Sequence, residues 1–541
     1  MFRIRFVLIS IMLFLSLRAF LLPLLGEGVV QTHDGENHLA RFAQYYLALR
    51  QGQFPPRVAP YMMGGYGYPV FNYNYPLPNI LAIPFTSFDI SIEFTFKLLM
   101  FVSIVFGARG VFVFFRQHTT KEVASFGVLS FILAPFLYSD FFARGVIGEM
   151  MAYAIFPHLF LSFDLFLKKQ TVARFLYVHA MVLSLLLSHN IFVLYLVPLF
   201  AAYWIVRMYQ AKWNAFFLYA IPYLLAGLSA CFFWIPAMFE QGFVVMKYVN
   251  LTQFYSSHFP TMLQLFSSPF DRGFSYEGPV DALSFSLGLL TIVSIPLFFA
   301  QLVFMRNNKK PYFSIFVLSL LILFLMQPIS LFIWKAFPLL QFTQFPWRLI
   351  GIFALCFLPL QVMVYHKASS NLKLFLLGVS FLMVLSLTRI QNLPRIHHNN
   401  AYYFSFAETS TVQHENQPVT LTEVPQDLSS QYPILKSGEV LEIKKWNGSY
   451  HRYTVRMFED GLVTEPTAFF HGWETKINGK KIEIEHQKSG GLISFSVPVG
   501  EHEIESRFTQ NTPARLIGNS LSVIGVIGVG IFSICIKKKY A

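Results

Sequence analysis

Long apolar runs separated by short polar segments dominate the pattern of this chain. Runs of about 20 apolar residues are long enough to cross the hydrocarbon core of a bilayer as a helix. Such runs lie near 5–26, 92–116, 121–138, 148–167, 173–189, 191–208, 214–238, 283–305, 312–327, 345–366, 371–389 and 516–536. The pattern predicts an α-helical polytopic membrane protein with about 12 transmembrane helices.

A further apolar segment, 76–90, is interpreted from the distribution of basic residues, which concentrate in cytoplasmic loops. If 76–90 does not cross the membrane, the basic clusters all lie on one side, namely Arg3/Arg5, Arg116/Lys121, Lys168/Lys169/Arg174, Arg207/Lys212, Arg306/Lys309/Lys310, His366/Lys367/Lys373 and Lys537–Lys539. If it crosses, this agreement ends from Arg116 onward. We therefore expect cytoplasmic N- and C-termini, and a re-entrant or interfacial segment at 76–90 that starts at Pro76 and Pro78.

The segment 390–513 has a different pattern, in which apolar and polar residues alternate, as at Ile493, Phe495 and Val497. Turn dipeptides recur through it, at Asn447-Gly448, Asp460-Gly461, Asn478-Gly479 and Gly490-Gly491. Both features are typical of strands joined by hairpins. We expect a multi-helix membrane domain over 1–389 with a first outer loop at 27–90, a small extracytoplasmic β-sandwich-like domain over 390–513, and a C-terminal transmembrane helix with a basic cytoplasmic tail over 514–541.

Composition supports a membrane location and argues against nucleic acid as a partner. Of the 541 residues, 55% are hydrophobic and 13% are charged, whereas soluble proteins contain about 25% charged residues. The net charge of +13 is spread in short clusters between apolar runs, as in loops that face anionic membrane lipid. The N-terminal MFRIR and its apolar run resemble a signal peptide, but no small-residue cleavage site follows, so we expect a retained helix.

The predicted topology brings separate polar motifs to the outer face. The stretches 27–75, 239–282 and 390–513 emerge there. The same face receives the motif SDFFARGVIGEMMAY with Arg144 and Glu149, the turn at His189, and the FPWR motif that ends at Arg348. Ionisable residues at the mouth of a helix bundle commonly face a cavity or a substrate path. We therefore expect one shared site on this face.

Arginines of this face are candidate ligands for a phosphate group, because a guanidinium matches phosphate geometry. The candidates are Arg144, Arg348 and Arg18, which lies in the outer half of the first helix. Glu149 would belong to the same substrate site, unless Arg144 and Glu149 simply neutralise each other or pair with the nearby aspartate. His189 is a further substrate-binding candidate, although a polar hairpin turn between two short helices is the simpler account.

The stretch QTHDGENHLARF follows the first apolar run and is rich in ionisable groups. If a helix begins near Gly35, Asp34, His38 and Arg41 lie near one another on its polar side. Asp34 is a candidate catalytic base, with His38 and Arg41 as substrate ligands, since a base must be held within reach of its proton. The simpler interpretation is that Asp34 is the helix N-cap. Glu36 is a second catalytic candidate, and the two carboxylates could hold Mg²⁺ or Mn²⁺, for which two carboxylates alone are weak evidence.

A loop rich in glycine and tyrosine follows, with Tyr66, Tyr68 and Tyr73 interleaved with glycines. Tyrosine rings offer flat amphipathic faces that contact sugars or sit at the headgroup level of a membrane. We expect these three residues to bind substrate, and an aromatic belt around an irregular loop is the alternative. The chain contains no Walker A motif, no G-x-G-x-x-G before a helix, no H-E-x-x-H and no paired C-x-x-C.

At HDGENHLARF, followed by FPPRVAPYMMGGYGYPVFNYNYPLP, the chain resembles the bacterial membrane proteins described as 6-pyruvoyl-tetrahydropterin synthase-related. RGVIGEMMAYAIFP and LQFTQFPWRLIGI match further patterns of that family. The tail FFHGWETKINGKKIEIE…VPVGEHEIESRF…LIGNSLS is similar to the outer C-terminal domain of YfhO-type proteins. The matches cover most of the chain and imply an integral protein of the bacterial plasma membrane.

That group in turn resembles the GT-C glycosyltransferases, which have many helices and a carboxylate in the first outer loop. The resemblance implies a polyprenyl-phosphate sugar donor, transfer outside the cytoplasm, and a loop carboxylate that acts as base toward the acceptor hydroxyl. By position, Asp34 matches that carboxylate. Glu36 forms only a D-x-E pattern rather than the paired aspartates of some members, so no particular metal is implied.

We therefore expect a GT-C-type glycosyltransferase that moves a sugar from a polyprenyl-phosphate donor to an extracytoplasmic glycan or polymer of the cell envelope. The donor would enter between helices near 76–90, and Arg144, with Arg348 or Arg18, would hold its phosphate. One alternative is a transporter or flippase for a lipid-linked substrate, a class whose polar residues gather near the bilayer midplane. The other is a non-catalytic membrane assembly protein that keeps the fold.

Overall fold

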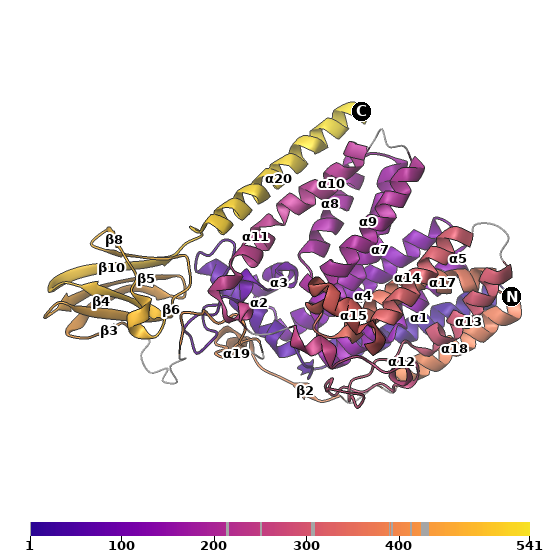
Figure 1. The fold of residues 1–541 in the computed structure, drawn as a ribbon, viewed down its shortest axis with the longest axis horizontal. Helices are drawn as coiled ribbons and strands as arrows, with labels where there is room; N and C mark the ends of the chain where they lie inside the picture. Colours follow the sequence, from indigo (N-terminus) through magenta and orange to yellow (C-terminus); the bar gives the residue numbers. More distant parts are fainter. Residues whose placement is uncertain are drawn as a thin grey trace.

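The computed structural model describes residues 2–211, 216–248, 252–304, 309–388, 390, 393–411, 414–422 and 432–540. Most of them form helices that pack side by side, and two antiparallel sheets project from one end of this bundle (Figure 1). The helices are α1 (Phe2–Leu25), α2 (Gly35–Arg50), α3 (Leu77–Ser87), α4 (Ile92–Arg116), α5 (Lys121–Ile132), α6 (Pro135–Tyr138), α7 (Ile147–Lys168), α8 (Val172–Leu186), α9 (Asn190–Ala211), α10 (Phe216–Ser229), α11 (Cys231–Phe239), α12 (Met262–Ser267), α13 (Leu289–Phe304), α14 (Lys309–Leu325), α15 (Leu331–Ala336), α16 (Pro338–Gln341), α17 (Leu349–Lys367), α18 (Ser370–Thr388), α19 (Asn400–Phe404) and α20 (Pro513–Tyr540).

Seven of the described helices are long and apolar enough to cross a membrane, namely α1, α4, α7, α9, α17, α18 and α20. Three bent pairs raise the number to 10 if each is one span: α5 with Pro135–Arg144, α10 with α11, and α14 with Pro328–Ala336. The described residues thus support an α-helical membrane protein, with fewer candidate spans than the expected 12. The two expected spans outside this count are 173–189 and 283–305, where the described helices α8 and α13 have 15 and 16 residues.

The segment expected to be re-entrant or interfacial forms the short helix α3, which has 11 residues. A helix of this length extends about 16 Å, roughly half the thickness of a bilayer core. α3 packs against α2 and α4. Its length explains why an apolar segment here does not add a full span to the helix bundle.

The C-terminal strands form two antiparallel sheets with a shared core. One sheet has the order β4-β5-β10-β7-β8 and the other has the order β3-β6-β9. The strands are β3 (Ile434–Leu435), β4 (Gly438–Asn447), β5 (Tyr450–Met457), β6 (Gly461–Ala468), β7 (Trp473–Ile477), β8 (Lys480–Ile482), β9 (Leu492–Val497) and β10 (Gly500–Phe508). One hydrophobic cluster includes Tyr453 and Ile504 of the first sheet and Val463 and Phe495 of the second, so the sheets face each other as in a sandwich.

Two of the sequence patterns for this region are confirmed, namely the buried apolar residues of β9 and the turn at Asn478-Gly479. Ile493, Phe495 and Val497 of β9 are all buried, as their alternation predicts. Asn478 and Gly479 form the two-residue connection between β7 and β8, and both have positive φ, at 48° and 79°. This conformation suits a tight hairpin turn, and Asn-Gly adopts it at low cost. From β10 the chain enters α20, whose far end points away from the sheets (Figure 1).

The segment that follows α18 is tied to the first loop and to the bundle. β1 (Val29–Val30) pairs antiparallel with β2 (Arg395–Ile396). Glu93 of α4 is almost fully buried and accepts hydrogen bonds from His397 Nδ1 at 2.8 Å, from the His398 backbone N–H at 2.7 Å and from the Tyr403 hydroxyl at 3.1 Å. One carboxylate therefore anchors this segment, because a buried charge is stable only when its hydrogen bonds are made.

A second buried carboxylate, Glu240 at the end of α11, fastens α20 to the first loop. Arg515 of α20 donates from Nη2 to Glu240 Oε2 at 2.9 Å, and Asn72 of the first loop donates to the same oxygen at 2.9 Å. The Thr512 hydroxyl donates to Oε1 at 2.5 Å, and the Tyr73 hydroxyl donates to the Glu240 backbone carbonyl at 2.6 Å. The guanidinium of Arg515 is fully buried, so its pairing with Glu240 determines how α20 packs.

The Arg515→Met variant should be strongly destabilised, because it leaves the Glu240 carboxylate buried without its counter-charge. Breaking one side of a buried ion pair costs about 3–5 kcal/mol. Thermal unfolding of the purified protein in detergent measures this loss. Adding Glu240→Gln to the same chain should restore a large part of the lost stability.

The matched control is Arg452→Met, which removes an arginine whose ion pair with Glu503 is 43% and 35% exposed on its two sides. Exposed pairs contribute little to stability because water screens them. Equal losses in Arg515→Met and Arg452→Met would contradict the role assigned to the buried pair.

Candidate functional site

The motif around Arg144 forms one irregular turn between two helices. Ser139–Arg144 forms a π-helical turn, and Gly145 follows with a φ of +71° before α7 begins at Ile147. A Cβ atom at Gly145 would collide with the side chain of Thr32 in the first loop. Glycine is therefore required there both by the left-handed backbone and by the close approach of the first loop.

This turn places Arg144 between two carboxylates. Arg144 Nη1 lies 2.5 Å from Asp140 Oδ1 and 2.5 Å from Glu149 Oε2, and its Nη2 donates to Glu149 Oε1 at 2.8 Å. The guanidinium also lies over the Trp347 ring, 4.8 Å from its centroid. The side chains of Asp140 and Glu149 are fully buried, and that of Arg144 is 4% exposed. Bidentate hydrogen bonds between an arginine and a carboxylate are among the strongest in proteins, and they hold this arginine in the interior.

Two further predicted residues reach the same carboxylate. Arg348 Nε lies 3.5 Å from Glu149 Oε1, and His189 Nε2 lies 3.7 Å from that oxygen. Arg348 also donates to the Thr343 backbone carbonyl at 3.0 Å. We call Asp140, Arg144, Glu149, His189 and Arg348 the Arg144 cluster. The structure thus brings together four site residues that the sequence predicted from three separate motifs.

His189 directly precedes the first residue of α9, Asn190, in the turn that follows α8. Its Nδ1 accepts the backbone N–H of Phe192 at 3.4 Å, which leaves Nε2 to carry the proton that faces Glu149. Burial lowers the pKa of His189 to about 3, and the Glu149 carboxylate only partly opposes this shift. His189 is therefore neutral at physiological pH.

Asp34 occupies the N-cap position of α2 but does not cap it. Its side chain makes no capping hydrogen bond, and the Thr32 hydroxyl instead accepts the Gly35 N–H at 3.1 Å. The Asp34 backbone N–H donates to the Arg144 carbonyl at 2.8 Å, which joins the first loop to the Arg144 cluster. The half-buried carboxylate acts electrostatically on Arg144 and Arg348. Within the described part of the chain, it has no hydrogen-bond partner of its own.

His38 connects Asp34's helix to the cluster through Tyr75. The Tyr75 hydroxyl lies 3.4 Å from His38 Nε2, and the ring centroid of Tyr75 lies 4.8 Å from that of His189. Burial holds the pKa of His38 well below its usual value, with the positive charge of Arg41 acting in the same direction. Burial likewise raises the pKa of Tyr75. Both groups are uncharged at neutral pH and can only exchange hydrogen bonds.

Two predicted residues of α2 point elsewhere. Arg41 is buried and donates to Ser410, from Nε to the hydroxyl at 3.0 Å and from Nη2 to the carbonyl at 2.5 Å. Glu36 accepts the Tyr402 hydroxyl at 2.9 Å, and His398 Nε2 lies 3.6 Å from it. The spacing of Arg41 with Asp34 and His38 predicted one shared polar side, but Arg41 instead bonds the segment after α18. Glu36 contacts the same segment.

The predicted sugar-binding tyrosines are buried in their own contacts. The Tyr68 hydroxyl bonds Thr411 at 2.5 Å and accepts the Asn416 N–H at 3.1 Å. Tyr73 bonds Glu240, and Tyr66 is 5% exposed, with its carbonyl accepting the Ala468 N–H at 2.8 Å. In this arrangement the three residues tie the first loop to neighbouring segments, and their buried rings do not offer faces to a sugar.

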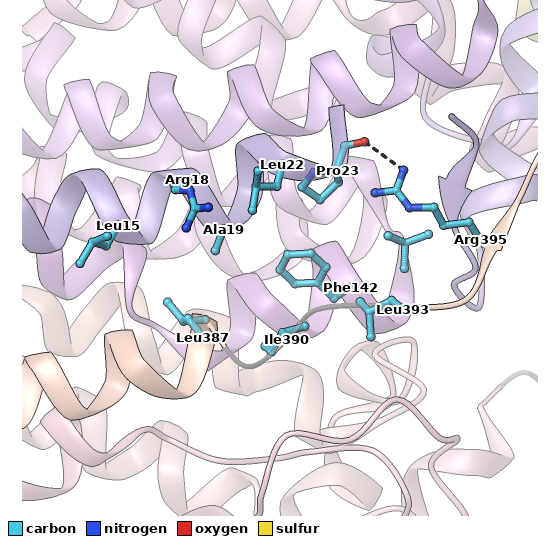
Figure 2. A pocket seen from close by; sticks show the side chains of 11 residues that line it. Leu15, Arg18, Ala19, Leu22, Pro23, Phe142, Leu387, Ile390, Leu393 and Arg395 are labelled. Carbon is cyan, nitrogen blue, oxygen red and sulfur yellow. Dashed lines mark hydrogen bonds between the residues drawn. The ribbon is translucent and has the colours of Figure 1, made fainter. Parts of the chain in front are cut away.

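Arg144 does not fit the expected role of phosphate ligand in this arrangement. Its guanidinium is enclosed and its N–H groups already donate to two carboxylates, so they are not available to a phosphate. Of the three arginines expected to contact phosphate, Arg18 is the exposed one, and it lines a groove beside α1 (Figure 2). Among the described residues, no group of three or more His, Cys, Asp or Glu side chains could hold a metal ion.

A second groove lies beside α2 and was not expected from the sequence. Its volume is about 500 Å³, and its polar lining includes Asn37, Thr409, Thr411, His414 and Gln417. Asn37 stands three residues after Asp34, so the two side chains lie on the same side of α2. The sequence did not indicate these residues, because isolated neutral polar side chains form no recognisable pattern.

The chain matches no family model and no curated protein. The function must therefore be inferred from the arrangement of the site residues. This arrangement combines a half-buried carboxylate at Asp34, a buried ion cluster next to it, and two grooves. Each groove has a lining residue within four positions of Asp34 along the chain, Val30 in one and Asn37 in the other.

The stability of the His189→Gln variant should fall less at acid pH than that of the wild type. Between pH 6.5 and about 3 the unfolded chain protonates His189 and the folded chain does not. Wild-type stability therefore falls as the pH drops below 6.5, by about 2 kcal/mol at pH 5 from this residue. Melting temperatures measured at pH 7.5 and pH 5 should differ less in the variant than in the wild type.

The exposed His118 provides the control, and His118→Gln should retain the wild-type difference between the two pH values. A His189→Gln variant with the full wild-type difference would contradict the burial of an uncharged imidazole beside Glu149.

Proposed function

We propose that this protein is a GT-C-type glycosyltransferase with about 12 membrane spans, which transfers a sugar from a polyprenyl-phosphate donor to a glycan acceptor outside the cytoplasm. The observation that carries the proposal is the Asp34 carboxylate. It stands at the start of α2, half-buried, and its oxygens are not used by hydrogen bonds of the described residues. A general base needs such a free acceptor at a defined place.

Asp34 would accept the proton of the acceptor hydroxyl as that oxygen attacks the anomeric carbon of the donor sugar. The bond between the anomeric carbon and the phosphate oxygen breaks, and the lipid phosphate leaves with the electron pair. The groove that begins at Asn37 supports a polar acceptor, since its amide, hydroxyl and imidazole groups can bond sugar hydroxyls. Its volume of about 500 Å³ is suitable for sugar units.

In this proposal the Arg144 cluster positions Asp34 and does not contact the donor. The Arg144 backbone carbonyl accepts the Asp34 N–H at 2.8 Å, and the Ala143 carbonyl accepts the His33 N–H at 3.0 Å. Two main-chain bonds thus fix the residue before α2 against the Ser139–Gly145 turn.

One observation favours a second candidate, a non-catalytic membrane assembly protein. The Arg144 cluster is closed and self-neutralised, as in a structural ion network, and neither groove is lined by Asp34 or Arg144. The sheets would then recruit partner proteins. The two candidates differ in whether the Asp34 carboxylate is needed for chemistry.

Replacing Asp34 by Asn should abolish transfer while the protein stays folded. Loss of a general base lowers the rate by at least about 100-fold. The assay follows sugar release from a panel of radiolabelled polyprenyl-phosphate sugars in purified membranes. Asp89→Asn is the matched control, because Asp89 is an exposed carboxylate at the end of α3, and this variant should transfer at the wild-type rate.

Full complementation of a deletion strain by Asp34→Asn would reject the catalytic role and leave the assembly protein as the better account. Glu36→Gln tests the second carboxylate separately. Since Glu36 is bonded to Tyr402, its replacement should loosen α19 from α2 and lower the melting temperature.

A further inference from the structure

The groove beside α1 has apolar walls and two arginines. It has a volume of about 260 Å³ and lies between the last turns of α1 and the segment that follows α18 (Figure 2). Leu15, Leu22, Leu387 and Leu393 form much of its wall. None of its 11 lining residues is acidic, and only Arg18 and Arg395 are charged. The groove is thus amphipathic with a positive charge.

Arg18 carries a charge that the described part of the chain does not balance. It lies within an apolar span, seven residues before the end of α1, and its side chain is exposed. Its guanidinium forms neither an ion pair nor a hydrogen bond with the described residues. A charged arginine inside a membrane costs at least about 2.5 kcal/mol unless it meets a counter-charge or reaches the interface. Among the described residues, no group supplies this counter-charge.

Arg395 is held in place from the other side of the groove. It donates from Nη1 to the Glu27 carbonyl at 2.9 Å and lies 3.4 Å from the Pro23 carbonyl, at the end of α1. β2 fixes its backbone against β1. Figure 2 shows Arg18 and Arg395 on either side of Leu22 and Pro23. The two guanidinium groups therefore line one groove, with the second one already oriented.

Apolar side chains are also exposed elsewhere along the two helices. α1 and α18 pack against each other. Ile11 and Phe14 of α1 are 50% and 68% exposed, and Phe381 and Leu382 of α18 are 45% and 54% exposed. In a bilayer such a face is covered by hydrocarbon chains. A molecule with an anionic head and a long apolar chain would match both the arginines and this face.

We propose that this groove binds the phosphate group of a membrane lipid, with Arg18 on the phosphate, Arg395 adding positive charge near the end of α1, and the hydrocarbon chain along α1 and α18. A guanidinium is well suited to phosphate oxygens. The site would take either a phospholipid headgroup or a polyprenyl phosphate, since both present the same chemistry. The lining also includes Val30, four residues before Asp34.

If the proposed transfer reaction is correct, this groove is where the donor phosphate arrives, and that reading rests on the proposed function. Lipid binding itself does not require transfer. The groove can therefore bind lipid while the transfer assay fails, and transfer can be detected while this groove binds no lipid. The two outcomes are distinguishable.

The test is a lipid titration of the purified full-length protein in maltoside micelles, which contain no phosphate, with bound lipid counted by native mass spectrometry. The probes are phosphatidylglycerol, a long-chain polyprenyl phosphate, uncharged diacylglycerol and inorganic phosphate. Wild type should retain one or both lipid phosphates and not diacylglycerol. Arg18→Gln should raise the half-saturating lipid concentration at least about tenfold, the effect of one charge-assisted hydrogen bond.

Arg109→Gln is the matched control. Arg109 is also an exposed arginine inside an apolar span, seven residues before the end of α4, but it does not line the groove. This variant should bind lipid phosphate within about twofold of wild type. Ala19→Trp keeps both arginines and fills the groove, so it should weaken binding of the lipids as Arg18→Gln does.

The relative affinity of the two lipid phosphates identifies the source of the ligand, and a clear preference for either one supports the site. Unchanged binding in both Arg18→Gln and Ala19→Trp would overturn the proposal, and so would an equal loss in Arg109→Gln. Displacement of both lipids by inorganic phosphate alone would show a free-anion site and would overturn the lipid assignment.

Discussion

The Glu149 carboxylate can stay in the protein interior only because Arg144 meets it with two nitrogen atoms, and much of the surrounding structure follows from this pairing. An unpaired charge at such a depth would cost several kcal/mol. To bring Arg144 into place, the chain makes a π-helical turn that ends at Gly145. The same turn offers its carbonyl groups to the backbone of His33 and Asp34. The position of the first loop is therefore a consequence of a buried ion pair.

The same constraint recurs at other buried carboxylates. Glu93 collects hydrogen bonds from the segment after α18, and Glu240 collects them from the first loop and α20. Glu122 accepts Arg5 Nε at 2.7 Å and the Tyr365 hydroxyl at 2.8 Å, which joins α5 to α1 and α17. Apolar contacts between helices do not by themselves fix one relative position, because several apolar packings of similar volume are tolerated. Each buried acid adds a point at which segments far apart in the chain must meet in one register.

The polar groups thus fall into two kinds, those bonded within the chain and those still free to bond other molecules. Arg144, Arg41, Tyr68 and Tyr73 bond other groups of the chain, so they define its shape and hold the first loop. The Asp34 carboxylate, the polar groove beside α2 and Arg18 face outward and have capacity left for other molecules. Polar residues near one another in sequence thus serve different purposes, as Asp34 and Arg41 on the same helix demonstrate.

Local patterns in the sequence were enough to place the apolar helices, the strands with alternating burial and the Asn478-Gly479 hairpin, because each depends on neighbouring residues alone. They also indicated that the Arg144, Glu149, His189 and Arg348 motifs share one face. Only the tertiary structure decided that Arg144 is enclosed, that Arg41 bonds Ser410, that the Tyr68 ring is buried, and that Arg395 lines a groove with Arg18. The physical reason is that the state of a charged or polar side chain depends on which distant groups pack against it, and spacing along the chain carries no record of those partners.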